Sequence, residues 1–240
     1  MKDFSLQLYS LREVPTLRQR MEIAAQAGYT GVEFAGYDGI AGPEMRRLLA
    51  SLGLRGTGSH IAYDALRDDL DGCVRYCLEA GITSAACPGC EMNDRDQALA
   101  QAEFLEACAE RFGAEGIPFA YHNHAHEFAD AGNGETLFDV LLHNTSKLGA
   151  ELDVFWVAYA GYDPVEYIRK YAGRQPLMHL KELAADRRAN VELGTGVLDF
   201  TAIIRAGQQA GAEHFIIEQE EYTLPPLESC KASLDAVLRL

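Results

Sequence analysis

Apolar and polar positions follow two alternating patterns along the chain. Short apolar runs such as "FSLQLYS" (residues 4–10) and "HFII" (214–217) are typical of buried strands. Between such runs lie stretches with helical periodicity, such as "PTLRQRMEIAAQA" (15–27), "PEMRRLLASL" (43–52) and "DRDQALAQAEFLEACAERF" (94–112). Pro15 and Pro43 lie near the starts of the first two, where a missing N–H costs least. The pattern therefore predicts strands and helices in alternation.

A glycine stands between each helical stretch and the next apolar run. This arrangement occurs seven times, as in "AGYTGVEF" from residue 27, "EGIPFAYH" from 115 and "AGAEHFIIE" from 210. Glycine suits a helix C-terminus because the capping residue takes a left-handed conformation. Together with the first strand, the repeats give eight β-then-α units, which predict a single (β/α)8 TIM barrel over residues 1–240. The competing doubly wound sheet is disfavoured, because "GTGSH" (56–60) lacks the third glycine of G-x-G-x-x-G.

The charge and composition of the chain limit the kinds of molecule that we expect it to bind. A formal charge of -15 argues against a nucleic-acid partner, since phosphate binding needs a basic face. No apolar run reaches the roughly 18 residues of a membrane helix, and the first residues lack a signal-peptide core. A cytoplasmic location with reduced cysteines is therefore expected. The "CPGC" pair, Cys87 and Cys90, is interpreted as small apolar residues at a strand end, with a redox or metal role as the alternative.

Polar side chains end four consecutive predicted strands. The strand endings are "FAYHNHAHEF", "ELDVFW", "LMHLKE" and "FIIEQEE". Alternate residues of a strand share one face, and the active site of such a barrel lies at the carboxyl ends of its strands. The inward set at these ends is His122, His124, Asp153, His179, Lys181, Glu218 and Glu220. These residue types are metal ligands or acid–base catalysts, so the four endings together predict a metal or catalytic site.

Each of these residues also has a structural interpretation. Asp153 could be the N-cap of a following helix, and His179 could be a satisfied core histidine. Lys181 could form half of a salt bridge with Glu220. Glu218 directly follows the apolar "HFII", so its carboxylate must be paired, bound to a metal or shifted in pKa. "GTGVLDF" (194–200) could offer backbone N–H groups to a phosphate, although a turn is the simpler interpretation.

The chain resembles the xylose isomerase-like TIM-barrel superfamily, and in particular its sugar phosphate isomerase/epimerase members. The resemblance spans nearly the whole sequence and rests on "QLYSLR" (7–12), "GYTGVEFAG", "GSH", "YHNHAHEF", "ELDVFWV", "DPVEYIRKYAGR", "MHLKE" and "GTGVLDF". Related members include inosose dehydratases, tagatose-3-epimerase-like enzymes and endonuclease IV. The last is disfavoured here by the acidic chain and by Trp156, which stands where many members carry a further histidine. Barrels of this family commonly pair, so a homodimer is one expected form.

The resemblance implies one divalent metal ion (Mn, Co, Zn, Fe or Mg) held by Glu, Asp, His and Glu. Asp153, His179 and Glu218 match three of these positions. For the first position the sequence offers Glu127, in "HEF", or His122, which occupies the strand ending itself. Glu127 is the expected ligand and His122 the alternative, so a site with either residue remains open.

The implied reaction is sugar isomerisation or epimerisation through proton abstraction next to a carbonyl and a metal-stabilised enediolate. Glu127 and Glu218 are the expected proton carriers, and Lys181 is expected to polarise an oxygen. A lyase or dehydratase acting on a keto-sugar or keto-cyclitol is the alternative, and an inactive sugar-binding barrel is a further one. The carbohydrate substrate is expected to contact six residues: Gln7, Glu33, His60, His122, His124 and Trp156.

Overall fold

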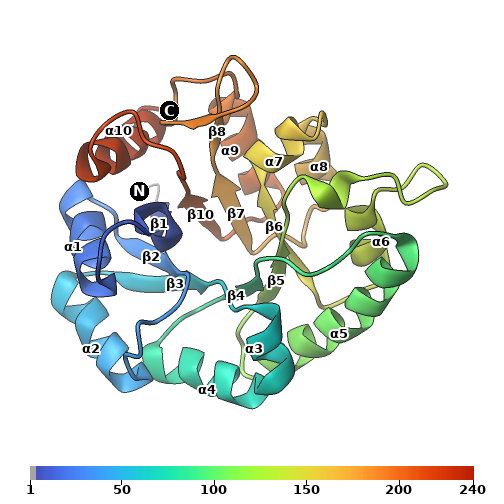
Figure 1. The fold of residues 1–240 in the computed structure, drawn as a ribbon, viewed down its shortest axis with the longest axis horizontal. Helices are drawn as coiled ribbons and strands as arrows, with labels where there is room; N and C mark the ends of the chain where they lie inside the picture. Colours follow the sequence, from blue (N-terminus) through green and yellow to red (C-terminus); the bar gives the residue numbers. More distant parts are fainter. Residues whose placement is uncertain (1–3) are drawn as a thin grey trace.

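A computed structural model describes residues 4–240 and shows one barrel of eight parallel strands (Figure 1). Neighbouring strands follow the order β3-β2-β1-β10-β7-β6-β5-β4. The strands are β1 (Phe4–Gln7), β2 (Gly31–Phe34), β3 (Arg55–Ser59), β4 (Ala85–Cys87), β5 (Phe119–His122), β6 (Gly149–Asp153), β7 (Leu177–Leu180) and β10 (His214–Ile217). Parallel bridges from Gly56 to Ile82 and from His60 to Ala86 close the ring between β3 and β4. The predicted (β/α)8 barrel is confirmed.

Helices surround the strands on the outside of the barrel (Figure 1). The longer ones are α1 (Leu17–Ala27), α2 (Gly42–Leu52), α4 (Leu70–Ala80), α5 (Arg95–Gly113), α9 (Phe200–Gln209) and α10 (Pro226–Leu238). Shorter ones are η1 (Leu8–Leu11), α3 (Tyr63–Asp68), η2 (His126–Phe128), α6 (Leu137–His143), α7 (Val154–Tyr159) and α8 (Pro164–Lys170). The main core lies between helices and strands, where leucine, phenylalanine and methionine side chains are almost fully buried. Helix α10 packs against α1, as expected of an amphipathic closing helix.

Residues with known capping preferences mark the helix ends, as helix α1 illustrates. Helix α1 begins after Thr16, whose side chain accepts a hydrogen bond from the Gln19 N–H, and ends at Gly28 with φ = +102°. The first strand is shorter than the expected 4–10. It ends at Gln7, because the Gln7 side chain accepts the Tyr9 N–H and starts the 3-10 helix η1.

The two-stranded hairpin of β8 (Glu182–Leu183) and β9 (Asn190–Val191) follows β7 and was not expected from the sequence. The buried Glu182 carboxylate holds the following turn against this hairpin. It accepts hydrogen bonds from the N–H groups of Gly194 and Leu198 at 3.1 and 3.0 Å. The "GTGVLDF" segment is therefore a turn whose amides already bind a carboxylate of the same chain.

None of the helices within residues 4–240 combines the length and the apolarity of a membrane-spanning segment. The six cysteines all lie in this range and are free. Cys87 is buried at the end of β4 and Cys90 is partly buried after it, as expected for reduced residues at a strand end.

Glu192 ties the segment after β10 to the start of α10. Its carboxylate accepts hydrogen bonds from the Thr223 N–H, the Thr223 hydroxyl and the Ser229 hydroxyl. Burial alone would raise the pKa of Glu192, but these donors outweigh it and lower the pKa to about 2.

We expect Glu192→Gln to lower the free energy of unfolding at pH 7 by about 2 kcal/mol, because the folded state favours the ionised carboxylate. The folded-state pKa lies below the ordinary 4.5, so this contribution is complete above pH 4.5 and is lost as the pH falls toward 2. Urea unfolding of both proteins between pH 7 and pH 3.5 measures the difference. If the difference in unfolding free energy between the two proteins stays constant over this pH range, the charge of Glu192 is not responsible for the stabilisation.

Candidate metal centre and substrate cavity

Four polar side chains from four consecutive strands of the barrel converge at its carboxyl end. They are His122 at the end of β5, Asp153 at the end of β6, His179 on β7 and Glu218 directly after β10. One ligand atom from each lies within 4.8 Å of the others, and all four residues are buried. The parallel register explains the convergence, since Asp153 pairs with His179 across β6 and β7.

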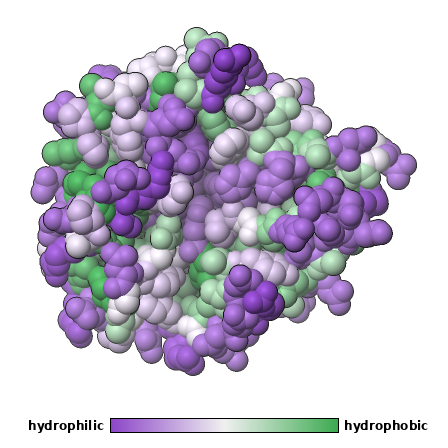
Figure 2. All heavy atoms as spheres, in the orientation of Figure 1, coloured by the Kyte–Doolittle hydropathy of each residue, from purple (hydrophilic) through white to green (hydrophobic). Residues whose placement is uncertain are grey.

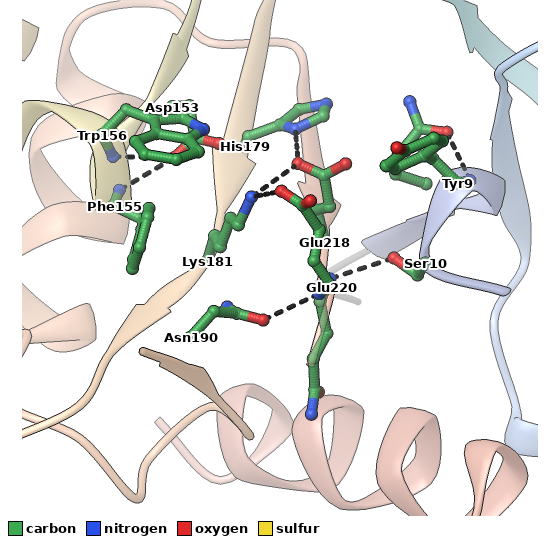
Figure 3. A network of polar contacts seen from close by, with 12 residues as sticks. Tyr9, Ser10, Asp153, Phe155, Trp156, His179, Lys181, Asn190, Glu218 and Glu220 are labelled. Carbon is green, nitrogen blue, oxygen red and sulfur yellow. Dashed lines mark hydrogen bonds and ion pairs between the residues drawn. The ribbon is translucent and has the colours of Figure 1, made fainter. Parts of the chain in front are cut away.

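Asp153 caps a helix with one carboxylate oxygen and keeps the other available as a metal ligand. Its Oδ1 accepts the N–H groups of Phe155 and Trp156 at 2.9 and 3.2 Å, and so caps α7 (Figure 3). Its Oδ2 is buried without a hydrogen-bond partner among residues 4–240. Asn123 fixes the backbone by bonding both the N–H and the C=O of Asp153. Burial raises the pKa of Asp153 to about 7, so its ionised form needs a nearby positive charge.

His179 lies between carboxylates on both of its ring nitrogens. Its Nδ1 is 3.2 Å from Glu218 Oε2, and its Nε2 is 2.6 Å from Glu33 Oε2. Burial alone would lower the pKa of His179, but Glu151 and Glu33 together raise it well above its usual value. A carboxylate behind one nitrogen orients the ring and leaves the other nitrogen for a metal ion.

His122 has a different environment, although its ring packs 4.5 Å from that of His179. Its Nδ1 is buried with no hydrogen-bond partner within residues 4–240, and Glu151 Oε2 lies 3.6 Å away. Burial, reinforced by the neighbouring His179, holds the pKa of His122 well below its usual value. The ring is therefore neutral, which is the form that binds metals.

Lys181 holds Glu218 in its ionised form. The Lys181 ammonium contacts Glu220 and lies 3.5 Å from Glu218 Oε2, as Figure 3 shows. Burial would raise the pKa of Glu218, but Lys181 and His179 together outweigh it and keep the pKa well below its usual range. The ammonium also lies 5.0 Å from the centre of the Trp156 ring. The salt bridge with Glu220, one of two interpretations from the sequence, is present.

Glu127 lies outside this group, in the short helix η2. Both oxygens of its carboxylate are occupied: Oε1 accepts the Tyr121 hydroxyl at 2.7 Å and Oε2 accepts the His124 N–H at 2.8 Å. Burial raises the pKa of Glu127. The structure thus brings His122, the alternative first ligand, together with the other three residues.

Two further residues lie beneath the group. Glu33 and Gln7 are fully buried, and Gln7 Nε2 donates to Glu33 Oε2 at 2.7 Å. Neither residue lines the cavity above the group, and their contact with a sugar stays a prediction. Glu151 was missed as a site residue, although its spacing of two from Asp153 on β6 places both on the inner face. It binds His60 Nε2 at 2.7 Å.

A cavity of about 590 Å³ opens above the group. Hydrophilic side chains surround the hollow in the centre of the face shown in Figure 2. His60, His122, His124 and Trp156, all expected substrate contacts, line the cavity together with Glu218. Burial lowers the pKa of His124 to about 4, so its ring is neutral at pH 7. The Trp156 Nε1 is buried with no hydrogen-bond partner within the described range.

The donor set fits a divalent cation. It combines two carboxylates with two imidazoles, which suit Mn²⁺, Fe²⁺, Co²⁺ or Zn²⁺. The buried, unpartnered Asp153 Oδ2 and His122 Nδ1 are the kind of atoms that a bound ion would satisfy. Glu33 behind His179 supplies the outer carboxylate that metal-bound histidines usually have.

Comparisons with known proteins agree with this fold. A sugar phosphate isomerase/epimerase from Parabacteroides distasonis ATCC 8503 has 22% sequence identity and a TM-score of 0.84, with 100% of this chain and 99% of that chain covered. An L-ribulose 3-epimerase has 18% identity and a TM-score of 0.78, with coverage of 100% and 94%. The IOLI protein with a bound zinc atom has 13% identity and a TM-score of 0.80, with coverage of 99% and 97%.

At these identities the solved structures establish the fold alone, and no curated protein sequence matches the chain. The family described as "Xylose isomerase-like TIM barrel" matches residues 21–240, which is most of the sequence. The chain therefore belongs to the xylose isomerase-like TIM-barrel family.

Proposed function

We propose that this protein is a divalent-metal-dependent sugar isomerase or epimerase. The observation that carries the proposal is the convergence of four buried residues, each with a ligand atom within 4.8 Å of the others, beside a cavity that His122 and Glu218 line. His122, Asp153, His179 and Glu218 would hold the ion. When bound, the ion supplies a Lewis acid that polarises a substrate carbonyl and stabilises the negative charge developing on its oxygen.

The chain's own residues would move the proton. Glu218 lies in the cavity wall and is kept ionised by Lys181, so it can accept a proton from the carbon next to the carbonyl. His124 is neutral and lines the same cavity from the segment after β5, so it can relay a proton on another side of the substrate. Lys181 acts as a positioning residue through Glu218.

Glu127 was expected from the sequence as a ligand and proton carrier. We now propose a positioning role for it, because its carboxylate holds the backbone of His124 and the hydroxyl of Tyr121. Trp156 would present its ring to a sugar face and its free Nε1–H to a hydroxyl group.

A lyase reaction is the second candidate, favoured by His60. This residue lines the cavity, and although burial alone would lower its pKa, Glu33 and Glu151 raise it above the usual value. A protonated imidazole at this place can donate to a departing oxygen, which would turn proton abstraction into β-elimination.

Solvent exchange tests the proposal. The Mn²⁺-loaded protein is incubated in D₂O with a panel of ketoses and cyclic ketones, and the products are analysed by proton NMR and mass spectrometry. Deuterium at the carbon next to the carbonyl without loss of water supports isomerisation or epimerisation. Exchange with loss of water supports the lyase, and absence of exchange with every compound would contradict both.

Replacing Glu33 tests whether the carboxylate that binds the His179 ring supports metal binding. We expect Glu33→Gln to weaken Mn²⁺ binding by about tenfold, within the 10- to 100-fold range typical of such partners, because the His179 ring loses an anionic partner. Isothermal titration calorimetry measures the affinity, and Glu221→Gln, which removes an exposed carboxylate after β10 outside the ligand group, serves as the control. Equal affinities for wild type and Glu33→Gln would show that this hydrogen bond does not support metal binding.

A further inference from the structure

The cavity above the candidate metal centre has two unlike halves. His122, His124, Trp156, Glu218 and Glu220 come from the strands that carry the metal ligands. The opposite wall comes from the β1–β4 side of the barrel and is mainly apolar. Apart from His60 and residues 35–36, its members are Tyr9, Tyr37, Ile61, Ala62, Ala65 and Pro88.

The cavity is larger than a simple sugar requires. A hexose has twelve non-hydrogen atoms, and even at the ~30 Å³ that a water molecule occupies in the liquid it needs at most about 360 Å³. The cavity offers about 590 Å³, a volume within the range for ligands considerably larger than a monosaccharide. A free sugar bound to the metal ion would leave the apolar half in contact with water.

Side chains of the apolar half are held in position by contacts behind them, and several are exposed to solvent. The Tyr37 ring stacks on Tyr76 at 3.9 Å between centroids, and its hydroxyl is tied to the Ser59 hydroxyl at 2.7 Å. Tyr9 is 43% exposed, and Ala62 and Ala65 of the α3 region are also exposed. A contiguous apolar wall that faces solvent beside a polar site is typical of a surface that a ligand covers.

Among residues 4–240, the cavity offers a phosphate group no unpaired cationic side chain, since His60 already contacts Glu151 at 2.7 Å and Glu33 at 3.3 Å. None of the residues that line it, within the described 4–240 range, is lysine or arginine. The nearby Lys181 is already neutralised by Glu218 and Glu220, and the amides of the "GTGVLDF" turn bind Glu182.

We infer that the substrate is an uncharged sugar derivative that carries an apolar substituent, such as an aryl group, and not a free or phosphorylated sugar. The sugar part lies at the metal centre, and the substituent packs against Tyr9, Tyr37 and Ile61. This inference rests on the proposed function, since it assumes that the metal end of the cavity holds the sugar.

The test compares the binding of phenyl and methyl glycosides of the same sugars: glucose, galactose and xylose. These glycosides have no free carbonyl, so they report on binding and not on turnover. Isothermal titration calorimetry on the Mn²⁺-loaded protein is expected to show that at least one phenyl glycoside binds about tenfold or more tightly than its methyl counterpart, because only the aryl group covers the apolar wall. The 6-phosphate of glucose or galactose is expected to bind more weakly than the methyl glycoside of the same sugar.

Two variants locate the substituent. Ala65→Phe fills the apolar half from an exposed position and is expected to weaken phenyl glycoside binding at least tenfold while methyl glycoside binding stays within twofold. Ala50→Phe, the same change at an exposed position on α2 outside the cavity, is the matched control and is expected to change neither.

Equal binding of phenyl and methyl glycosides, or tighter binding of the phosphate, would overturn the inference. Equal weakening of both glycosides by Ala65→Phe would also overturn it, as would the absence of binding by every glycoside. The metal content of the same samples distinguishes a failure of this inference from a failure of the proposed function. If one equivalent of metal is bound and solvent exchange occurs with a free sugar, the proposed function stands and only the substrate class is wrong.

Discussion

Replacing Asp153 by asparagine is expected to lower the affinity for Mn²⁺ by more than 100-fold and to abolish solvent exchange. Asp153 offers a ligand atom within 4.8 Å of those of the other three residues, and its buried Oδ2 has no hydrogen-bond partner within residues 4–240. Its carboxylate supplies charge that an amide does not. Changes to partners of a ligand typically cost 10- to 100-fold in affinity, and loss of an anionic ligand should exceed that range. Calorimetric titration and mass-spectrometric metal analysis measure the effect.

The same substitution separates the ligand role from the cap role. Asparagine is as good an N-cap as aspartate, so the hydrogen bonds to Phe155 and Trp156 can persist. Burial raises the pKa of Asp153 to about 7, which means that ionising it in the metal-free protein costs stability as the pH rises from 4 toward 7. Metal-free Asp153→Asn should therefore melt no lower than metal-free wild type at pH 8. Lower melting combined with retained metal would contradict the account.

His122→Ala is expected to reduce Mn²⁺ affinity by at least 100-fold, whereas Glu127→Gln is expected to leave it within about threefold. The reason is geometric: His122 offers a ligand atom within 4.8 Å of those of Asp153, His179 and Glu218, whereas both Glu127 oxygens already accept hydrogen bonds elsewhere. The expected cost of Glu127→Gln is instead about 1–2 kcal/mol of folding stability, because an amide cannot accept from both Tyr121 and the His124 N–H.

These two variants change the two candidate first ligands of the same segment, one by removing an imidazole and the other by removing a carboxylate charge. Metal content by inductively coupled plasma mass spectrometry gives the first difference, and urea unfolding gives the second. Metal loss in Glu127→Gln with retention in His122→Ala would restore Glu127 as the ligand and would reverse the assignment made from the structure.

The fold was largely predictable because local chemistry and global pattern agree. Glycines such as Gly28 and Gly211, with positive φ, end helices before strands, and this repeat gave eight units. The hairpin of β8 and β9 was not predictable, since its strands are two residues long and depend on long-range bonds to Glu182. Such contacts leave no periodic signal in the sequence.

The site was predictable only to the level of strand ends. Alternation along β6, β7 and the end of β10 placed Asp153, His179 and Glu218 on one face, and the structure places them together. Which residue after β5 joins them depends on how the chain turns into η2, and this turn directs Glu127 toward Tyr121. Spacing in the sequence does not encode that direction, so His122 and Glu127 could not be separated beforehand.

The most direct test of the central claim is an anomalous diffraction map from crystals of the Mn²⁺-loaded protein, recorded near the manganese absorption edge. The account predicts one strong peak with His122, Asp153, His179 and Glu218 within about 2.0–2.4 Å, the range for nitrogen and oxygen ligands. A peak coordinated by Glu127, a peak elsewhere in the barrel, or no peak at full loading would contradict it.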